Sequence, residues 1–256
     1  MELWTAEHAK TLLPAVAVMI VIAAILRITI GKKDLKIRMI PFQIVASILF
    51  AIEVGKQVMS LLQGYDLYHL PFHFCSLFIF MMPLMAFYKG KHKATVTAIT
   101  SAICMATTFL TLVYPCLIYS ASDITNFFSN YFCFHTVTFH NLVIFGIILI
   151  LALNLHTPQQ KETKTIILFT VCFCVVSAAM AQLLQTNFNN FYSCNIPPLE
   201  SLRQSLQGIL GYGLTQGLYI LIVTVLDILF VFGSYWLYRL LRPIFIITTG
   251  RAGGMH

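Results

Sequence analysis

The residues with the greatest chemical potential in this sequence are one cysteine and several histidines. Cys75 follows His73 by two positions in the run HLPFHFC, and His135 and His140 lie in the run FCFHTVTFH. A thiolate is the strongest common side-chain nucleophile, and a nearby imidazole raises its population by accepting the thiol proton. Residues two apart in a regular helix point about 200° from each other. Cys75 would then need its base from elsewhere, and His135 and His140 are available.

The opposite interpretation of these residues is purely structural. Cysteine is common in apolar helices as a small hydrophobic residue, and histidines at helix ends often serve as hydrogen-bond anchors. Spacing alone therefore leaves catalysis by Cys75 as a hypothesis.

Glu53 and Lys56 are a second feature, because ionisable groups inside apolar runs need a reason to be there. A charge at mid-bilayer costs roughly 2.5–3.5 kcal/mol on insertion scales. Residues three apart share one face of a helix, so we expect Glu53 and Lys56 to pair. The pair is either a neutralising structural contact or part of a functional cavity. Asp227 has no such partner in its own run and must meet a donor from another helix or be protonated.

Amide side chains complete a polar group on one side of the chain. Gln182, Asn187, Asn189 and Asn190 lie near the end of one apolar run, and His69 lies near the start of another. Tying down loops is the expected role of most of these amides. Together with the histidines and the charged pair, however, they predict a polar pocket open to one leaflet. We expect Glu53, Lys56, His69, Gln182, Asn187 and Asn190 to contact substrate there.

These residues must be positioned by membrane-spanning helices. Of the 256 residues, 59% are hydrophobic and only 10% are charged, too few to cover a water-facing surface. Helices are expected because lipid leaves backbone groups no other partner, and no run alternates as a barrel strand would. We predict an all-α polytopic bundle of about seven helices in a single domain, 1–256. The expected spans are 11–30, 40–62, 70–88, 95–119, 135–155, 166–186 and 214–238.

Basic residues fix the expected orientation. Alternate loops and the C-terminal tail hold twelve of the sixteen Lys and Arg residues, for example Lys32, Lys91 and Arg242. Since such residues remain in the cytoplasm, the N-terminus is expected outside and the C-terminus inside. The reactive residues then lie towards the external leaflet. The external segment 187–213 contains an amphipathic stretch that predicts a short helix at the membrane surface.

Several ligand classes are not expected. No CxxC pair occurs, and only His69 and His73 have metal-ligand spacing, so we predict no metal and no cofactor. The net charge of +7 is explained by the loops, so we expect no nucleic-acid partner. Cys133 and Cys194 both fall in external segments and could form a disulfide or stay free. A protein partner chain is possible and its identity is unknown.

Three runs carry a family resemblance: LPFHFCS at 70–76, FFSNYFCFHTVTFHN at 127–141 and TNFNNFY at 186–192. They resemble the bacterial YwaF-like integral membrane proteins, and through them the chain is similar to eukaryotic transmembrane protein 164. The resemblance extends from the second to the seventh expected span. Since the eukaryotic relative is regarded as an acyltransferase that remodels phospholipids through a cysteine, the resemblance implies that role for Cys75. His73, His135 or His140 would be the base.

The leading hypothesis is therefore a lipid-modifying enzyme that transfers acyl groups through a cysteine thioester and has membrane lipids as partners. We expect it in a bacterial plasma membrane. The alternative is a small-molecule or proton-coupled transporter or binding protein that uses the polar residues within the membrane, although no repeated halves support it. An accessory role, in which the polar residues only order the bundle, also remains open.

Overall fold

The computed structural model describes residues 3–247, and within this range the chain forms helices and turns with no strand. Six segments are long and apolar enough to cross a membrane. They contain α1 (Ala6–Ile30), α2 (Leu35–Leu62), α4 (Lys93–Val113), α6 (Tyr131–Ala152), α7 (Thr163–Leu184) and α9 (Tyr212–Ile247). The predicted polytopic helical bundle is confirmed, with a shorter apolar helix at the position of the third predicted span.

That third helix begins late, at Cys75 instead of Leu70, and Pro71 keeps the residue before it out of the helix. Leu70 has φ −63° and ψ 147°, the extended conformation that a residue before proline prefers. The chain makes the short 3-10 turn η1 (Leu67–His69), then a further turn, and becomes helical only at η2 (Cys75–Leu77) and α3 (Phe78–Phe87). Proline also ends α4, since Tyr114 precedes Pro115 and the turn η3 (Pro115–Leu117). Cys75 is consequently the first residue of its helix.

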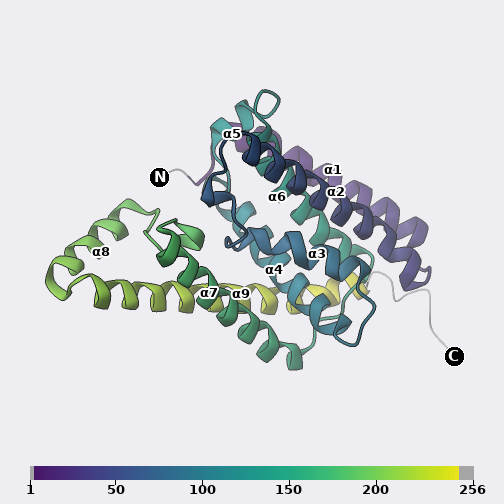
Figure 1. Cartoon of the computed structure of the whole chain (residues 1–256). Helices are drawn as coiled ribbons and strands as arrows, with labels where there is room; N and C mark the ends of the chain where they lie inside the picture. The colour runs from purple at the N-terminus through teal and green to yellow at the C-terminus, as the bar shows by residue number, and fades with distance from the viewer. Residues whose placement is uncertain (1–2, 248–256) are drawn as a thin grey trace.

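Helix α6 lies at the centre of the bundle and packs against α1, α2 and α4 (Figure 1). Phe42, Met82 and Val143 are fully buried in the core that these helices share with α3. A Cβ at Gly146 of α6 would lie 2.8 Å from Met82 Cε, so glycine permits the close approach of α3. Asn130 begins α6 by accepting the backbone N–H groups of Phe132 and Cys133.

The end of the bundle that carries the basic loops, here called the inner end, is held by buried polar contacts. Arg38 of α2 donates to the carbonyls of Leu153 and Asn154 just beyond α6, and Arg242 of α9 donates to the Asn154 side chain. The turn η4 (Gln160–Glu162) places Glu162 against the Tyr235 hydroxyl. Four elements are thereby joined at this end.

The opposite end, here called the external end, carries two short helices. These are α5 (Ala121–Thr125) and α8 (Pro197–Leu210), which lies away from α1 and α2 and joins α9 through Gly211 (Figure 1). Gly211 has φ 78°, a conformation that glycine adopts without strain. Leu202 and Ile209 of α8 are 57% and 79% exposed, so its apolar face does not pack on the protein. The predicted amphipathic helix is confirmed, with its apolar face available to lipid.

Candidate functional site

Cys75 occupies a half-buried position at the N-terminus of the helical segment Cys75–Phe87. The partial positive charge of a helix N-terminus favours an anion there and so favours the thiolate. Burial opposes the charged form, so a proton acceptor is still needed to generate it. Its position at the start of the helix thus gives this cysteine a setting suited to nucleophilic chemistry.

Two cavities meet at Cys75. The larger has a volume of about 690 Å³ and the smaller about 190 Å³. The residues that line both cavities are Tyr68, His73, Cys75, Ile118 and His140. Cys75 therefore lies in the wall between two spaces of different size, so groups bound in the two cavities would meet near this residue.

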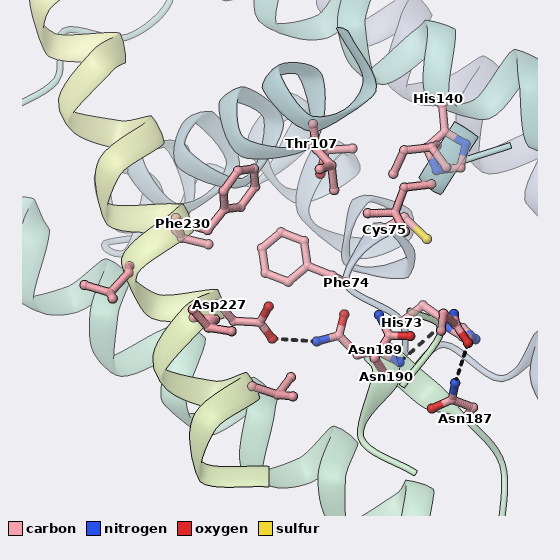
Figure 2. Close-up of a pocket in the computed structure, with 18 of the residues that line it drawn as sticks. His73, Phe74, Cys75, Thr107, His140, Asn187, Asn189, Asn190, Asp227 and Phe230 are labelled. Atoms are coloured by element: carbon pink, nitrogen blue, oxygen red, sulfur yellow. Dashed lines mark hydrogen bonds between the residues drawn. The ribbon is translucent and has the colours of Figure 1, made fainter. Parts of the chain in front are cut away.

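The two cavities differ in chemistry. The larger one is walled mainly by apolar residues of α4 and α9, such as Leu110, Leu226 and Phe230, with a few polar groups at one side. The smaller one contains Glu53, Lys56 and His69. Figure 2 shows the Phe74 ring inside the larger cavity, with Cys75 towards one side and Asp227 towards the other. An apolar group fits the larger cavity, and a charged or hydrogen-bonding group fits the smaller one.

His140 is buried beside Cys75 in the wall of both cavities. Its Nδ1 lies 2.7 Å from the carbonyl oxygen of Thr136, which can only accept, so Nδ1 carries the proton. Nε2 is then the acceptor atom of the ring. Figure 2 shows the imidazole above the thiol on the same side of the cavity. His140 is thus held in the tautomer that a general base requires.

His135 points in another direction because five residues turn a helix by about 500°, or 140° net. Its Nε2 donates to Glu53 Oε2 at 2.8 Å, and the other carboxylate oxygen accepts from Lys56 at 2.7 Å and Gln57 at 2.8 Å. The predicted pairing of Glu53 with Lys56 is present. This buried group of charges lines only the smaller cavity, and its carboxylate orients the His135 ring.

His73 is engaged through both ring nitrogens. Nε2 donates to the carbonyl of Tyr68 at 3.1 Å, and Nδ1 accepts the backbone N–H of Asn189 at 3.5 Å. Its ring packs against those of Tyr68 and Phe188. Burial lowers the pKa of His73 to about 4, so the ring is neutral near pH 7. These contacts suit a residue that joins two loops better than one that moves protons.

His69 and His73 do not share a helical face, since neither lies in a regular helix. His69 Nδ1 lies 2.7 Å from the Ser60 hydroxyl, and its ring stacks on Phe132. Burial lowers the pKa of His69, so this ring also favours the neutral form. The side chain is held in the wall of the smaller cavity.

The predicted amides gather on a loop that forms one side of the larger cavity. Asn187 and Asn190 line the cavity, and Asn190 Oδ1 is buried without a hydrogen-bond partner. Asn189 and Asn190 have φ 48° and 61°, which asparagine tolerates better than most residues. Gln182 does not line either cavity; it donates to the carbonyl of Phe191 and accepts from Tyr212.

Asp227 meets its donor from this same loop. Asn189 Nδ2 donates to Asp227 Oδ2 at 2.7 Å, and the Cys174 thiol lies 3.6 Å from the same oxygen. The expectation that Asp227 needs a partner from another element is confirmed. Because Asn189 also donates to His73, one loop residue connects α9 to the turn that precedes Cys75.

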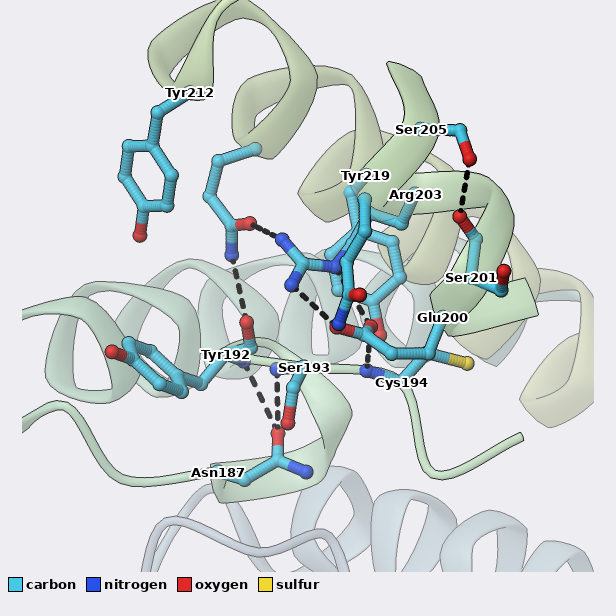
Figure 3. Close-up of polar contacts among 12 residues, drawn as sticks. Asn187, Tyr192, Ser193, Cys194, Glu200, Ser201, Arg203, Ser205, Tyr212 and Tyr219 are labelled. Atoms are coloured by element: carbon cyan, nitrogen blue, oxygen red, sulfur yellow. Dashed lines mark hydrogen bonds and ion pairs between the residues drawn. The ribbon is translucent and has the colours of Figure 1, made fainter. Parts of the chain in front are cut away.

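A polar network outside the cavity fixes the far end of this loop (Figure 3). Glu200 of α8 accepts the backbone N–H of Cys194 and two nitrogens of Arg203, and Arg203 also donates to Gln216 of α9. The Arg203 guanidinium lowers the pKa of Glu200 to about 2. The cavity wall is consequently anchored to α8 and α9.

Comparison with known protein families gives one match, a model of the TMEM164 family that spans residues 3–238. The chain belongs to the TMEM164 family. No curated protein and no solved structure matches significantly. The two cavities, Cys75 and all the histidines around it lie within the matched region. Membership confirms the relation to transmembrane protein 164 that the sequence suggested. It also supports the prediction that the chain is an integral membrane protein.

Two further features of the described residues concern the other cysteines and possible metal ligands. Cys133 and Cys194 are both free thiols rather than a disulfide. Among residues 3–247, no three His, Cys, Asp or Glu side chains are grouped as metal ligands.

Some lining residues could not be found from the sequence. Tyr68, Phe74 and Thr107 line the larger cavity and are ordinary apolar or polar residues in the sequence, with no spacing signal. Asn189 was expected among the amides, but its link to His73 and Asp227 depends on backbone conformations that close over distant segments.

Proposed function

We propose that this TMEM164-family chain is a membrane-embedded lipid-modifying enzyme that transfers acyl groups through a thioester on Cys75. The observation that supports this best is the position of Cys75 and His140 in the wall shared by the apolar and the charged cavity. The resemblance of 70–76 and 127–141 to bacterial proteins favours a bacterial plasma membrane as its location. Its partners are then membrane lipids.

The two cavities suit the two parts of a lipid. The larger cavity offers apolar walls such as Leu226 and Phe230 to an acyl chain and limits the access of water to a thioester. The smaller cavity offers Lys56 and His69 to polar atoms near the ester bond. A scissile ester would then lie at the junction, where the thiol is.

In the first half-reaction His140 acts as base. The Cys75 proton moves to His140 Nε2, and the thiolate attacks the carbonyl carbon of a lipid ester. The new C–S bond forms and the ester C–O bond breaks. The departing alkoxide takes the proton from His140 and leaves as a lipid alcohol.

The second half-reaction reverses these roles. A lipid hydroxyl gives its proton to His140 while its oxygen attacks the thioester carbon, and the C–S bond breaks. The thiolate then recovers the proton from His140. His135 is the alternative base, and the Glu53 carboxylate would then stabilise its protonated form. Because His135 does not line the larger cavity, we assign it a positioning and electrostatic role.

A lipid-exchange assay tests the proposal. The purified chain in nanodiscs would receive isotope-labelled phospholipid and unlabelled lysophospholipid, and transfer would be followed by mass spectrometry. Cys75→Ser is expected to lower transfer by at least about 100-fold and His140→Gln by about 100-fold, the usual contribution of a general base. Cys172→Ala is a matched control, because this exposed thiol lies on α7. Equal activity of Cys75→Ser and wild type would exclude the mechanism.

A second function, proton-coupled transport or binding of a small molecule, is favoured by Asp227. This carboxylate lines the larger cavity, and its contacts among the described residues are an amide and a thiol rather than a cation. Buried carboxylates in membranes often carry protons. Proteoliposomes that lose a substrate-dependent proton flux on Asp227→Asn, yet keep it with Cys75→Ser, would favour transport over acyl transfer.

A further inference from the structure

The inner end carries positive charge around the loop 153–157, which follows α6. Arg38 of α2 donates to the Leu153 and Asn154 carbonyls at 2.6 Å and 3.1 Å. Arg242 of α9 donates to Asn154 Oδ1 at 2.6 Å and to the His156 carbonyl at 3.2 Å. Arg242 lies within electrostatic range of Arg27 and Arg38. We call these three arginines, from α1, α2 and α9, the inner basic site.

The hydrogen bonds of Arg38 and Arg242 bring no negative charge. Their acceptors are backbone carbonyls and the side-chain oxygens of Asn154 and Thr157, all of them neutral. Within residues 3–247, neither guanidinium has a carboxylate within 4.0 Å. The nearby Glu162 instead accepts from Tyr235 and the Gln159 N–H and contacts His156.

Arg38 also retains an unused donor. Its Nε is buried and has no hydrogen-bond partner, although Nη1 makes two contacts. A buried donor without an acceptor costs about 1–3 kcal/mol, more when it is charged. An oxygen-rich anion beside this guanidinium would balance the positive charge that the neutral acceptors leave uncompensated.

The position of the site indicates where such an anion would come from. α1 ends at Ile30 and α2 begins at Leu35, so Arg27 and Arg38 lie within about two turns of the α1–α2 turn. Figure 1 shows the last turns of α9 at the same end of the molecule as this turn. Lys32 and Lys33 of the turn are charged, and Lys33 is exposed. This is the level of lipid headgroups on the inner leaflet.

We infer that the inner basic site binds the phosphate group of an anionic lipid. Guanidinium groups match phosphate oxygens geometrically, and basic pockets between helices on this side of a membrane suit anionic headgroups. This site is remote from Cys75 and does not depend on the acyl-transfer proposal. Its expected effect is a lipid-dependent stabilisation of the joined ends of α1, α2, α6 and α9.

Thermal unfolding of the full chain in detergent tests the inference. Phosphatidylglycerol, phosphatidylcholine and inorganic phosphate would be titrated separately, and the apparent dissociation constant read from the shift in Tm. Phosphatidylglycerol is expected to stabilise the protein, less so at high salt, and phosphatidylcholine much less. Arg38→Gln should weaken the effect by about tenfold, the loss of one charged hydrogen bond. Lys89→Gln with Lys91→Gln is the matched control, because it removes exposed charges from another inner loop.

If Arg38→Gln does not fold, Arg38→Lys serves instead, because it keeps the charge and lacks the planar guanidinium that matches phosphate oxygens; weaker phosphatidylglycerol binding by this variant supports the site. Equal stabilisation by inorganic phosphate would show that the site binds free phosphate ions and does not require a lipid headgroup. Equal stabilisation by phosphatidylcholine would overturn the inference. So would an equal loss in the Lys89/Lys91 variant, since diffuse charge would then explain the binding.

Discussion

The external and inner ends of the bundle differ in which interactions of their buried polar groups are left unmade. At the external end charge is balanced locally, since Glu53 contacts both Lys56 and His135. Hydrogen-bond acceptors nevertheless remain without a partner in residues that line a cavity; Asn190 Oδ1 is one of them. At the inner end most hydrogen bonds are made, but Arg38 and Arg242 have only neutral acceptors.

This difference separates two uses of buried polar groups. Acceptors that face an open space beside a nucleophile suit a ligand that enters and reacts. Arginines that hold a loop through neutral acceptors suit a permanent fold with an anion at its edge. Buried polar residues of a membrane protein therefore serve different roles. Those that border a cavity suit ligand binding, and those that contact only neighbouring residues suit a structural role.

The largest expected effect comes from removing the charge balance at the external end. Glu53→Ala leaves Lys56 and His135 buried without their carboxylate, which should destabilise the fold by about 3 kcal/mol or more. Denaturation in detergent would measure this loss. Glu53→Ala combined with Lys56→Met should be less damaging than Glu53→Ala alone; a larger loss in the double variant would contradict local charge balance.

A smaller effect is expected from the inner end. Tyr235 is fully buried, and its hydroxyl contacts Glu162 and the backbone of Gln159, so Tyr235→Phe keeps the shape and removes these hydrogen bonds. Stability should fall by about 1–3 kcal/mol. Lipid transfer per folded molecule should stay unchanged, because this residue lies outside both cavities. Reduced transfer with unchanged stability would contradict this account, because it would show that the inner end takes part in the reaction.

The buried His73 at the external end should make the stability of the protein depend on pH. Its pKa is lowered to about 4 because burial disfavours the charged ring, whereas an unfolded chain binds that proton near its usual pKa of about 6.5. Acidification through this window therefore favours unfolding, and stability contributed by His73 is lost as pH falls. Tm measured from pH 7.5 to 5 should decline less in His73→Gln. An identical decline in both proteins would show that His73 is not buried in this way.

The smallest effect is expected at the Glu200–Arg203 pair of α8, which lies outside both cavities. Glu200→Gln keeps an acceptor for the Cys194 N–H, and it removes the charge and the second acceptor oxygen that faces Arg203. Ion pairs three residues apart on one helix typically contribute less than about 1 kcal/mol and weaken with salt. A shift in Tm that persists in high salt would indicate a stronger role for α8 in holding the cavity wall.

Much of the architecture follows from local rules in the sequence. Apolar length predicted the spans, and spacing predicted the Glu53–Lys56 contact that the structure has at 2.7 Å. The rule that residues before proline are extended would also have shortened the third span at Leu70. A helix that began at Pro71 would still enclose Cys75, so it is the turn at residues 71–74 that leaves Cys75 at the N-terminus.

The candidate site was harder to predict because it depends on contacts between distant segments. The separation of His135 from His140 could be calculated from helix geometry, and the tautomer of His140 is set by the Thr136 carbonyl four residues earlier in the same helix; the remaining contacts join distant segments. The bridge from Asp227 through Asn189 to His73 needs a left-handed loop residue whose neighbours are far away in sequence. Nothing local to Tyr68 or Phe74 marks them as cavity residues.

The most direct test of the central claim is the intact mass of the protein purified with native lipid. Wild type, Cys75→Ala and His140→Ala would be compared with and without neutral hydroxylamine, which cleaves thioesters. We predict an added fatty-acyl mass in the wild type that hydroxylamine removes and that Cys75→Ala lacks. Absence of any adduct after incubation with ester lipids, with Cys75 alkylated as an ordinary thiol, would contradict acyl transfer through this residue.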